Sequence, residues 1–186
     1  MKSSESSFKW IEKGYELFAE EGPESIQIER LARELNLNKS GFYHYFGDRD
    51  VFFSGLMEHH FIMNGHFYDD VLKLKRFDPD YFHLLIKYKT TLLVQAQLRK
   101  QSGIHVYEEE FRKIKNRNDK AVVPLWAAYL KIPDNQKLAH ELWEILRDVF
   151  YMRLNTENLT FDFIYSLVSD FVRILEGFRY YKEKSE

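Results

Sequence analysis

The sequence has no cysteine and no long apolar run. Without cysteine, disulfide bonds, thiolate zinc sites and cysteine nucleophiles are excluded. The longest apolar run, VVPLWAAYL, is interrupted by Pro124 and falls well short of the roughly 18 residues that a membrane span requires. The opening MKSSESSFKW is too polar for the apolar segment of a secretion signal, so we expect a cytoplasmic location and no membrane partner.

Motifs of the common enzyme classes are also missing. The sequence has no HExxH motif, no paired Glu-x-x-His motifs for a di-iron site, no glycine-rich phosphate loop and no nucleophile elbow. Asp80 and His83 have the spacing of one such motif, but a di-iron site needs two. The acidic run 108–110 is more typical of a solvated face. We therefore expect no enzymatic activity, no cofactor and no bound metal.

Helical periodicity is what the sequence has in abundance. Hydrophobic residues make up 45% of the 186 residues and aromatic residues 17%, enough for one compact domain or a small module joined to a larger one. No segment shows a strand pattern with turn chemistry. We therefore predict an all-α fold. The predicted helices cover residues 8–21, 28–35, 39–46, a segment that begins at 49 and has weak points at Gly65 and 77–80, and then 81–99, 107–115, 123–130, 135–154 and 160–182. The apolar stripe of the first helix includes Trp10, Leu17 and Phe18, and Asp48 should cap the helix from 49, whose apolar side includes Val51 and Phe52.

The last two predicted helices are apolar around more of their circumference than one buried face requires. A surface helix needs an apolar stripe of only about 100°, whereas apolar residues cover over half of the helix 160–182. Two interpretations stay open. These helices are either central core helices of a monomer, or a two-helix surface that pairs with its copy in a homodimer.

Residues 28–46 have the spacing of a helix-turn-helix. Two helices that cross at about 90–120° need apolar residues at the crossing, a small residue where they touch, and a turn residue that tolerates a left-handed backbone. Ala32 is the small residue, Asn36 occupies the turn, and Asn38 can cap the second helix. The predicted apolar positions are Leu31, Leu35, Leu37, Phe42 and Tyr45.

The second helix of this motif contains five aromatic residues in a row, FYHYF, and helical geometry separates them. Phe42 and Phe46 are one turn apart and should face inward. The outer face then presents an ammonium, a hydroxyl, a phenol and an imidazole, which can bind phosphates or base edges in a major groove. These residues are Lys39, Ser40, Tyr43 and His44. Many helix-turn-helix proteins bind no DNA, so spacing alone leaves the function open.

The segments WIEKGYELFAEEG and IERLARELNLNKSGFYHYFGDRDVFF resemble the N-terminal domain of the TetR family of transcriptional regulators. The order and spacing match without a gap over about a quarter of the chain, from Trp10 to Phe53. The resemblance implies a helix-turn-helix DNA-binding domain over 1–52 and a helical ligand-binding and dimerisation domain over 53–186. It also implies a ligand-responsive regulator, most often a repressor, that acts as a homodimer on a palindromic operator.

The resemblance assigns roles to individual residues. Tyr43 would bind a backbone phosphate, His44 and Lys39 would reach bases or phosphates, and Arg49 would bind a phosphate where the next helix begins. The remaining expected DNA-binding residues are Gln27, Arg30, Asn38, Ser40 and Gly41, and Arg33 is a further candidate on the same helix as Arg30.

Three residues depart from the family pattern. Gln27 replaces a capping Ser or Thr, and Gly14 and Gly41 replace larger residues, each glycine costing about 0.5–1 kcal/mol relative to alanine. The first helix is also acidic. We expect modest DNA affinity and steep salt dependence.

The resemblance implies a small-molecule effector, and the rings of the C-terminal part favour an apolar or aromatic one. The candidate ligand-binding residues are Tyr88, Tyr107, Phe111, Trp126, Tyr129 and Phe150. An alternative function is compatible with the same fold: a TetR-like ligand- or partner-binding protein with weak or lost DNA binding. Residues 71–120 contain 12 Lys and Arg against 6 Asp and Glu, so this segment is either ordinary solvated surface or a site that attracts an acidic ligand or partner protein.

Overall fold

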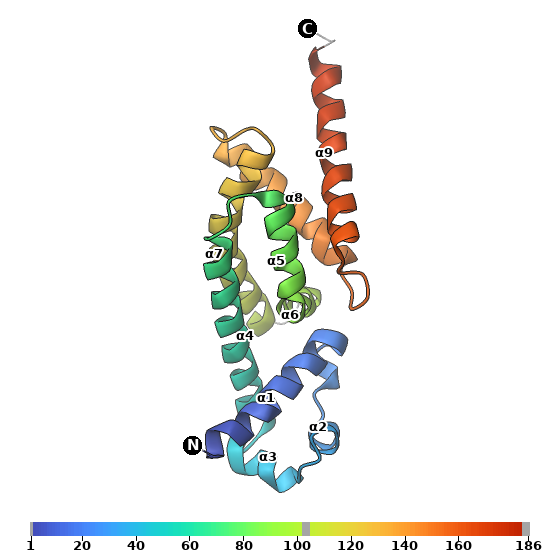
Figure 1. The fold of residues 1–186 in the computed structure, drawn as a ribbon. Coiled ribbons are helices and arrows are strands. Elements are labelled where there is room, and N and C mark those ends of the chain that lie inside the picture. The colour runs from blue at the N-terminus through green and yellow to red at the C-terminus, as the bar shows by residue number, and fades with distance from the viewer. Residues whose placement is uncertain (1, 102–104, 184–186) are drawn as a thin grey trace. The chain divides into compact units, whose positions relative to one another are not determined.

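The computed structural model describes residues 2–101 and 105–183, and its secondary structure there is helical, without strands. This confirms the predicted all-α fold. Figure 1 shows the order of the helices along the chain. Their bounds are α1 Lys2–Glu21, η1 Pro23–Ser25, α2 Ile28–Leu35, α3 Lys39–Phe46, α4 Arg49–Val71, η2 Phe77–Tyr81, α5 Phe82–Lys87, α6 Lys89–Lys100, α7 His105–Tyr129, α8 Gln136–Arg153 and α9 Phe161–Glu183.

The chain divides into two compact units. Unit 1 comprises Met1–Phe67 and Thr90–Ile114, and unit 2 comprises Tyr68–Lys89 and Lys115–Glu186. Helices α4 and α7 each contribute residues to both units. The division between a DNA-binding and a ligand-binding domain after residue 52 stays a prediction, and α4 runs through that point without interruption.

Helix α1 packs its apolar stripe inside unit 1. Trp10, Leu17 and Phe18 are buried, as their spacing predicted. Gly14 lies on the same stripe, where a Cβ atom would come within 2.6 Å of Cζ of Phe52 on α4. Glycine therefore lets α1 approach α4 closely, which accounts for one of the three departures from the family pattern.

A chain of buried hydrogen bonds joins four helices of unit 1. The Tyr15 hydroxyl on α1 lies 2.8 Å from Nδ1 of His60 on α4, and Nε2 of His60 lies 2.8 Å from Oε1 of Gln95 on α6. Nε2 of Gln95 donates to the carbonyl of Phe111 on α7 at 3.2 Å. Because that carbonyl and Gln95 Oε1 only accept, His60 Nε2 carries the proton and Nδ1 accepts from Tyr15. Burial lowers the pKa of His60 to about 4, so its ring is neutral near pH 7.

Two helices predicted over 107–115 and 123–130 are in fact the single helix α7, which contains Pro124. Proline in a helix interior removes a backbone hydrogen bond and costs about 3 kcal/mol or more. Val123 and Trp126 beside it are buried. Their packing outweighs the local cost of the proline. The predicted interruption over 116–122 was wrong, because α7 continues through this segment with Asp119, Ala121 and Val122 buried.

The predicted helix over 81–99 is divided instead. Tyr88, between α5 and α6, has φ −100° and ψ 28°, and its N–H bonds to the carbonyl of Leu84. Helix α4, by contrast, passes through Gly65, so that glycine is not a break.

Unit 2 has an aromatic core around Phe77 of η2. The ring of Phe77 lies 5.0 Å from Trp126, 5.2 Å from Tyr129 and 6.1 Å from Trp143, measured between ring centroids. Trp126 is fully buried. Its indole Nε1–H has no hydrogen-bond partner among the described residues.

A buried ion pair lies beside this core. Oδ2 of Asp119 on α7 accepts from Nη1 of Arg147 on α8 at 2.6 Å, and Oδ1 accepts from Nε1 of Trp143 at 2.7 Å. The side chains of Asp119 and Arg147 are both less than a tenth exposed. The carboxylate is therefore compensated inside unit 2.

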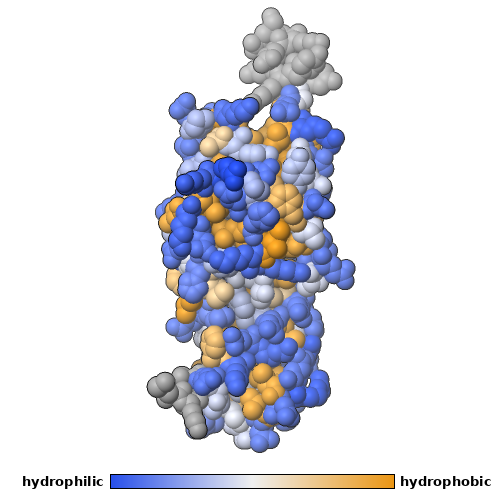
Figure 2. All heavy atoms as spheres, in the orientation of Figure 1, coloured by the Kyte–Doolittle hydropathy of each residue, from blue (hydrophilic) through white to orange (hydrophobic). Residues whose placement is uncertain are grey.

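Helices α8 and α9 expose part of their apolar surface while packing the rest. Trp143, Leu146, Ile164 and Leu167 are buried. Figure 2 shows an apolar patch, in orange, over α8 and α9. Large apolar side chains that remain exposed on these helices are Leu138, Ile145, Met152, Tyr165, Ile174 and Phe178.

Within the described residues, no helix combines the length and the apolar content required to cross a membrane.

Candidate nucleic-acid interface

Helices α2 and α3 are joined by the left-handed turn that the sequence predicted. Asn36 has φ 53° and ψ 44°, and its N–H bonds to the carbonyls of Ala32 and Arg33. The N–H of Leu37 also bonds to the Ala32 carbonyl, at 2.8 Å. These bonds terminate α2 and direct α3 across it, as in a helix-turn-helix.

The aromatic residues of α3 separate as predicted. Phe42 is fully buried, with ring centroids 5.5 Å from Trp10 and 5.1 Å from Phe52. Tyr45 and Phe46 are half-buried, while 51% of Tyr43 is exposed. Lys39, Ser40 and His44 are exposed as well. One face of α3 therefore fixes the helix in the core, and the other presents four polar side chains to solvent.

Two apolar residues on either side of α3 are more exposed than predicted. Leu37, expected at the helix crossing, is 42% exposed, and Val51, expected on the buried side of α4, is 53% exposed. Phe42 and Phe52, which were also predicted at buried positions, are fully buried and supply the inward packing.

The caps of these helices are only partly as expected. Gln27 and Asn38 occupy the N-cap positions of α2 and α3, but neither side chain makes a capping hydrogen bond within the described residues. At α4 the expected cap is present, since the Val51 N–H donates to Oδ1 of Asp48 at 2.8 Å. The first N–H groups of α3 therefore lack a side-chain acceptor and can donate to an anion.

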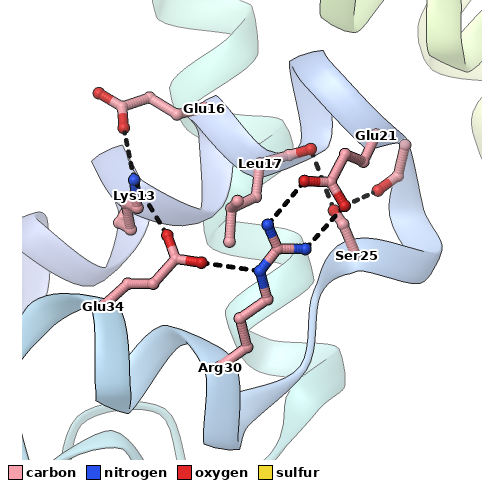
Figure 3. A network of polar contacts seen from close by, with 8 residues as sticks. Lys13, Glu16, Leu17, Glu21, Ser25, Arg30 and Glu34 are labelled. Carbon is pink, nitrogen blue, oxygen red and sulfur yellow. Dashed lines mark hydrogen bonds and ion pairs between the residues drawn. The ribbon is translucent and has the colours of Figure 1, made fainter.

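Arg30 is held by carboxylates within unit 1 (Figure 3). Its guanidinium donates to Glu21 on α1 at 2.6 and 2.7 Å and to Glu34 on α2 at 2.7 Å. Glu34 also pairs with Lys13 of α1 at 3.1 Å. Hydrogen bonds from Arg30 lower the pKa of both Glu21 and Glu34. Arg30 thus ties α2 to α1, and a phosphate would have to compete with two carboxylates for it.

Lys39, at the first position of α3, forms an ion pair that the sequence did not suggest. Its Nζ lies 2.9 Å from Oε1 of Glu29 on α2. This hydrogen bond raises the pKa of Lys39 and lowers that of Glu29, so both groups are charged near pH 7. Glu29 was not among the predicted site residues, because a ten-residue separation across a turn has no periodic signal.

Arg49 and Gly41 complete the predicted set. Arg49 is exposed at the start of α4, and its guanidinium donates to the Pro23 carbonyl at 3.3 Å. A Cβ at Gly41 would meet only Trp10, at 4.0 Å. The space around Gly41 is therefore open, unlike that around Gly14.

The charge of this region is opposite to that of a typical polyanion-binding surface. Residues 1–52 contain seven Lys and Arg against ten Asp and Glu. Several cations are already paired with acids of the same segment, as at Arg30 and Lys39. The groups that can bind an anionic partner are therefore concentrated on the outer face of α3 and at Arg49.

The structure distributes the predicted effector-binding residues unevenly. In unit 2, Trp126 and Tyr129 stack with centroids 5.8 Å apart, Phe150 is buried, and the Tyr88 hydroxyl donates to Asp70 at 2.9 Å. Phe111 belongs to unit 1. The side chain of Tyr107 lies outside the described residues.

A groove in unit 2 has a different character from the predicted aromatic pocket. It has a volume of about 460 Å³, is open to solvent, and is lined by five polar or charged residues and two apolar ones, none of them aromatic apart from the imidazole of His140. Asp119, His140 and Glu144 converge beside it to within 4.8 Å, but Arg147 and Lys115 already bind the two carboxylates. The residues lining the groove are Asn116, Asp119, Lys120, Val123, Pro124, Gln136 and His140.

Comparison with known proteins agrees with the geometry of α2 and α3. Residues 11–56 match the family of bacterial regulatory proteins, tetR family. No match was found among curated proteins. A solved structure assigned to the TetR family of transcriptional regulators, from Mesorhizobium loti MAFF303099, superposes with a TM-score of 0.53 at 13% identity, covering 94% of this chain and 98% of that chain. At this identity the superposition shows a shared fold, and the match over residues 11–56 confirms the predicted resemblance.

Proposed function

We propose, on the premise that the chain carries the N-terminal domain of the TetR family of bacterial regulatory proteins, that it is a DNA-binding transcriptional regulator. The observation that carries this proposal is the division of α3 into a buried side and an exposed polar side. Phe42 anchors the helix, and the exposed side chains enter a major groove. The proposed role is regulatory rather than catalytic, and we place it in the cytoplasm.

The exposed residues of α3 have complementary tasks in this proposal. Tyr43 donates its hydroxyl to a phosphate, and His44 and Lys39 reach base edges or phosphates. Ser40 and the free N–H groups at the start of α3 bind the backbone, and Arg49 does so from the start of α4. Arg30 has a supporting role, because its carboxylate partners hold it against α1.

We further propose a homodimer formed by α8 and α9. Both helices are packed on one side and carry large exposed apolar residues on another, including Ile145 and Phe178, which is 71% exposed. A second copy would cover this surface. Two copies would then read a palindromic site whose half-sites lie about one helical turn, roughly 34–36 Å, apart.

The effector is proposed to be an apolar or aromatic small molecule that binds in unit 2, with repression relieved on binding. Support comes from the rings around Trp126, whose buried Nε1–H could donate to one acceptor on such a ligand. The alternative, a TetR-like protein with weak or lost DNA binding, draws support from the acidic composition of residues 1–52.

Selection of bound duplexes from random-sequence DNA at two salt concentrations tests the proposal. Enrichment of a palindrome at both salt concentrations is the expected result, because base contacts persist when phosphate contacts weaken. The variant with Tyr43 and Lys39 both replaced by alanine serves as the negative control. Uniform weak binding that disappears at moderate salt would favour the alternative function.

A further inference from the structure

The ion pair between Lys39 and Glu29 differs from the other ion pairs around α2. The Arg30 side chain is only 26% exposed, whereas Lys39 is 54% and Glu29 66% exposed. The Lys39–Glu29 pair also joins the first turns of α2 and α3. It therefore places a cation and a carboxylate 2.9 Å apart, in solvent, beside the polar face of α3.

The donors and acceptors of such a pair are complementary to those of one base-pair edge. In the major groove a G·C pair presents two acceptors, N7 and O6 of guanine, next to one donor, N4 of cytosine. An ammonium can donate to the two acceptors while a neighbouring carboxylate accepts from N4. An A·T pair has a donor between two separated acceptors, so the ammonium would lose one of its two contacts.

We propose that Glu29 is a specificity-determining residue and that Lys39 and Glu29 together read one G·C pair in each half-site. This inference rests on the proposed function, since it requires α3 to lie in a major groove. Lys39 binds guanine, and Glu29 binds the amino group of the paired cytosine. The carboxylate thereby becomes part of the reading surface rather than only a partner of Lys39.

The position of Glu29 also lowers the affinity of the protein for DNA of other sequences. A carboxylate near the duplex is repelled by phosphates, and it competes with them for Lys39. Only a base with an amino group at the correct position compensates for this repulsion. Glu29 therefore lowers affinity for unrelated DNA while preserving affinity for the operator, which is a form of selection against wrong sequences.

The test compares base preferences of Glu29→Ala, Lys39→Ala and a matched charge control, Glu20→Ala. Glu20 is an exposed acid on α1, so the control changes net charge by the same amount. Each variant and the wild type select from the same random-sequence duplexes. In the wild type we expect one strongly preferred G·C pair per half-site, and in Glu29→Ala roughly tenfold less discrimination at that position.

Three results distinguish the possibilities. If Lys39→Ala relaxes the same position as Glu29→Ala and Glu20→Ala relaxes none, the joint reading is supported. If Glu29→Ala raises affinity for all sequences and leaves the base preferences of the wild type, Glu29 is only a counterion and the inference fails. If the wild type itself enriches no sequence, the proposed function fails first, and this is visible without any variant. Thermal melting followed by circular dichroism checks that the variants are folded. We expect melting temperatures close to that of the wild type, because the side chains of Lys39 and Glu29 are both exposed.

Discussion

The aromatic residues of α3 and those around Phe77 in unit 2 are similarly dense but differ in exposure. In α3, Phe42 is fully buried while its neighbour Tyr43 is 51% exposed. Around Phe77, Trp126 and Trp143 are both buried. The difference follows from the polar residues that share the outer face of α3 with Tyr43, namely Lys39, Ser40 and His44, because they keep that face in water. Ring density alone therefore distinguishes neither a binding surface nor a pocket from a core.

The sharpest test of this comparison removes a buried ring and an exposed ring from the same helix. Phe42→Ala should lower the free energy of unfolding by about 3–5 kcal/mol, because it leaves a cavity between α3, α1 and α4. Tyr43→Ala should change it little, since the ring is half in solvent. Urea unfolding followed by circular dichroism measures both. Equal losses in the two variants would contradict the assignment of inner and outer faces.

Acid should destabilise the protein through a buried histidine of unit 1. Unit 1 buries the neutral ring of His60, whose pKa is lowered to about 4 by burial. The unfolded chain takes up a proton at His60 below pH 6.5, and the folded chain does not until about pH 4. Stability should therefore fall as the pH drops from 6.5 to 4, by about 3 kcal/mol in total.

Replacing the imidazole isolates this contribution. His60→Gln should be less stable than the wild type at pH 7 and should show a flatter dependence on pH between 6.5 and 4. His83→Gln, an exposed position in unit 2, is the matched control and should keep the slope of the wild type. A wild-type slope in His60→Gln would mean that other groups govern acid unfolding. Urea unfolding at several pH values provides the measurement.

The exposed side of α3 should matter for DNA and not for folding. Tyr43→Phe removes one hydroxyl and should weaken operator binding roughly tenfold or more, as expected for the loss of one hydrogen bond to a charged group. Lys39→Ala should weaken it as well and, if the ammonium contacts a phosphate, reduce the slope of log affinity against log salt by about 1. Fluorescence anisotropy with the selected duplex measures both effects. Unchanged affinity in both variants would place the DNA contacts elsewhere.

The smallest expected effect concerns the two unusual glycines. Gly41→Ala should raise the free energy of unfolding by about 0.5–1 kcal/mol, because alanine favours helix and the space around Gly41 is open. Gly14→Ala should lower it, because the new methyl group would collide with Phe52. Thermal unfolding of the two variants gives opposite shifts if the packing of α1 on α4 is as described.

Local patterns were sufficient to predict much of the first unit. The fold class, the left-handed Asn36, the Asp48 cap and the division between Phe42 and Tyr43 all depend on residues within a few positions of one another. The interactions that escaped prediction join distant residues. Arg30 reaches Glu21 from another helix, and Glu29 meets Lys39 across a turn.

Tertiary packing also changed the outcome at positions where local sequence patterns had predicted something else. The polar segment 116–122 was read as a break, although α7 runs through it with Asp119 and Val122 buried. Gly14 was read as a simple cost, although it permits close contact with Phe52. Leu37 and Val51 were placed inside from periodicity and are exposed. The candidate effector residues were chosen by ring content alone, which says nothing about whether space remains between the rings.

The hydrogen-bond chain from Tyr15 to Phe111 has a consequence for anyone who shortens the protein. A fragment that ended after residue 52 would keep the Tyr15 hydroxyl, now buried at only 4% exposure, but lose the imidazole that accepts its proton. It would also expose the surface of α1 that Gln97 of α6 contacts at the Ala19 carbonyl. Such a fragment should be poorly folded on its own, and a stable minimal version should retain α4, α6 and the first turns of α7.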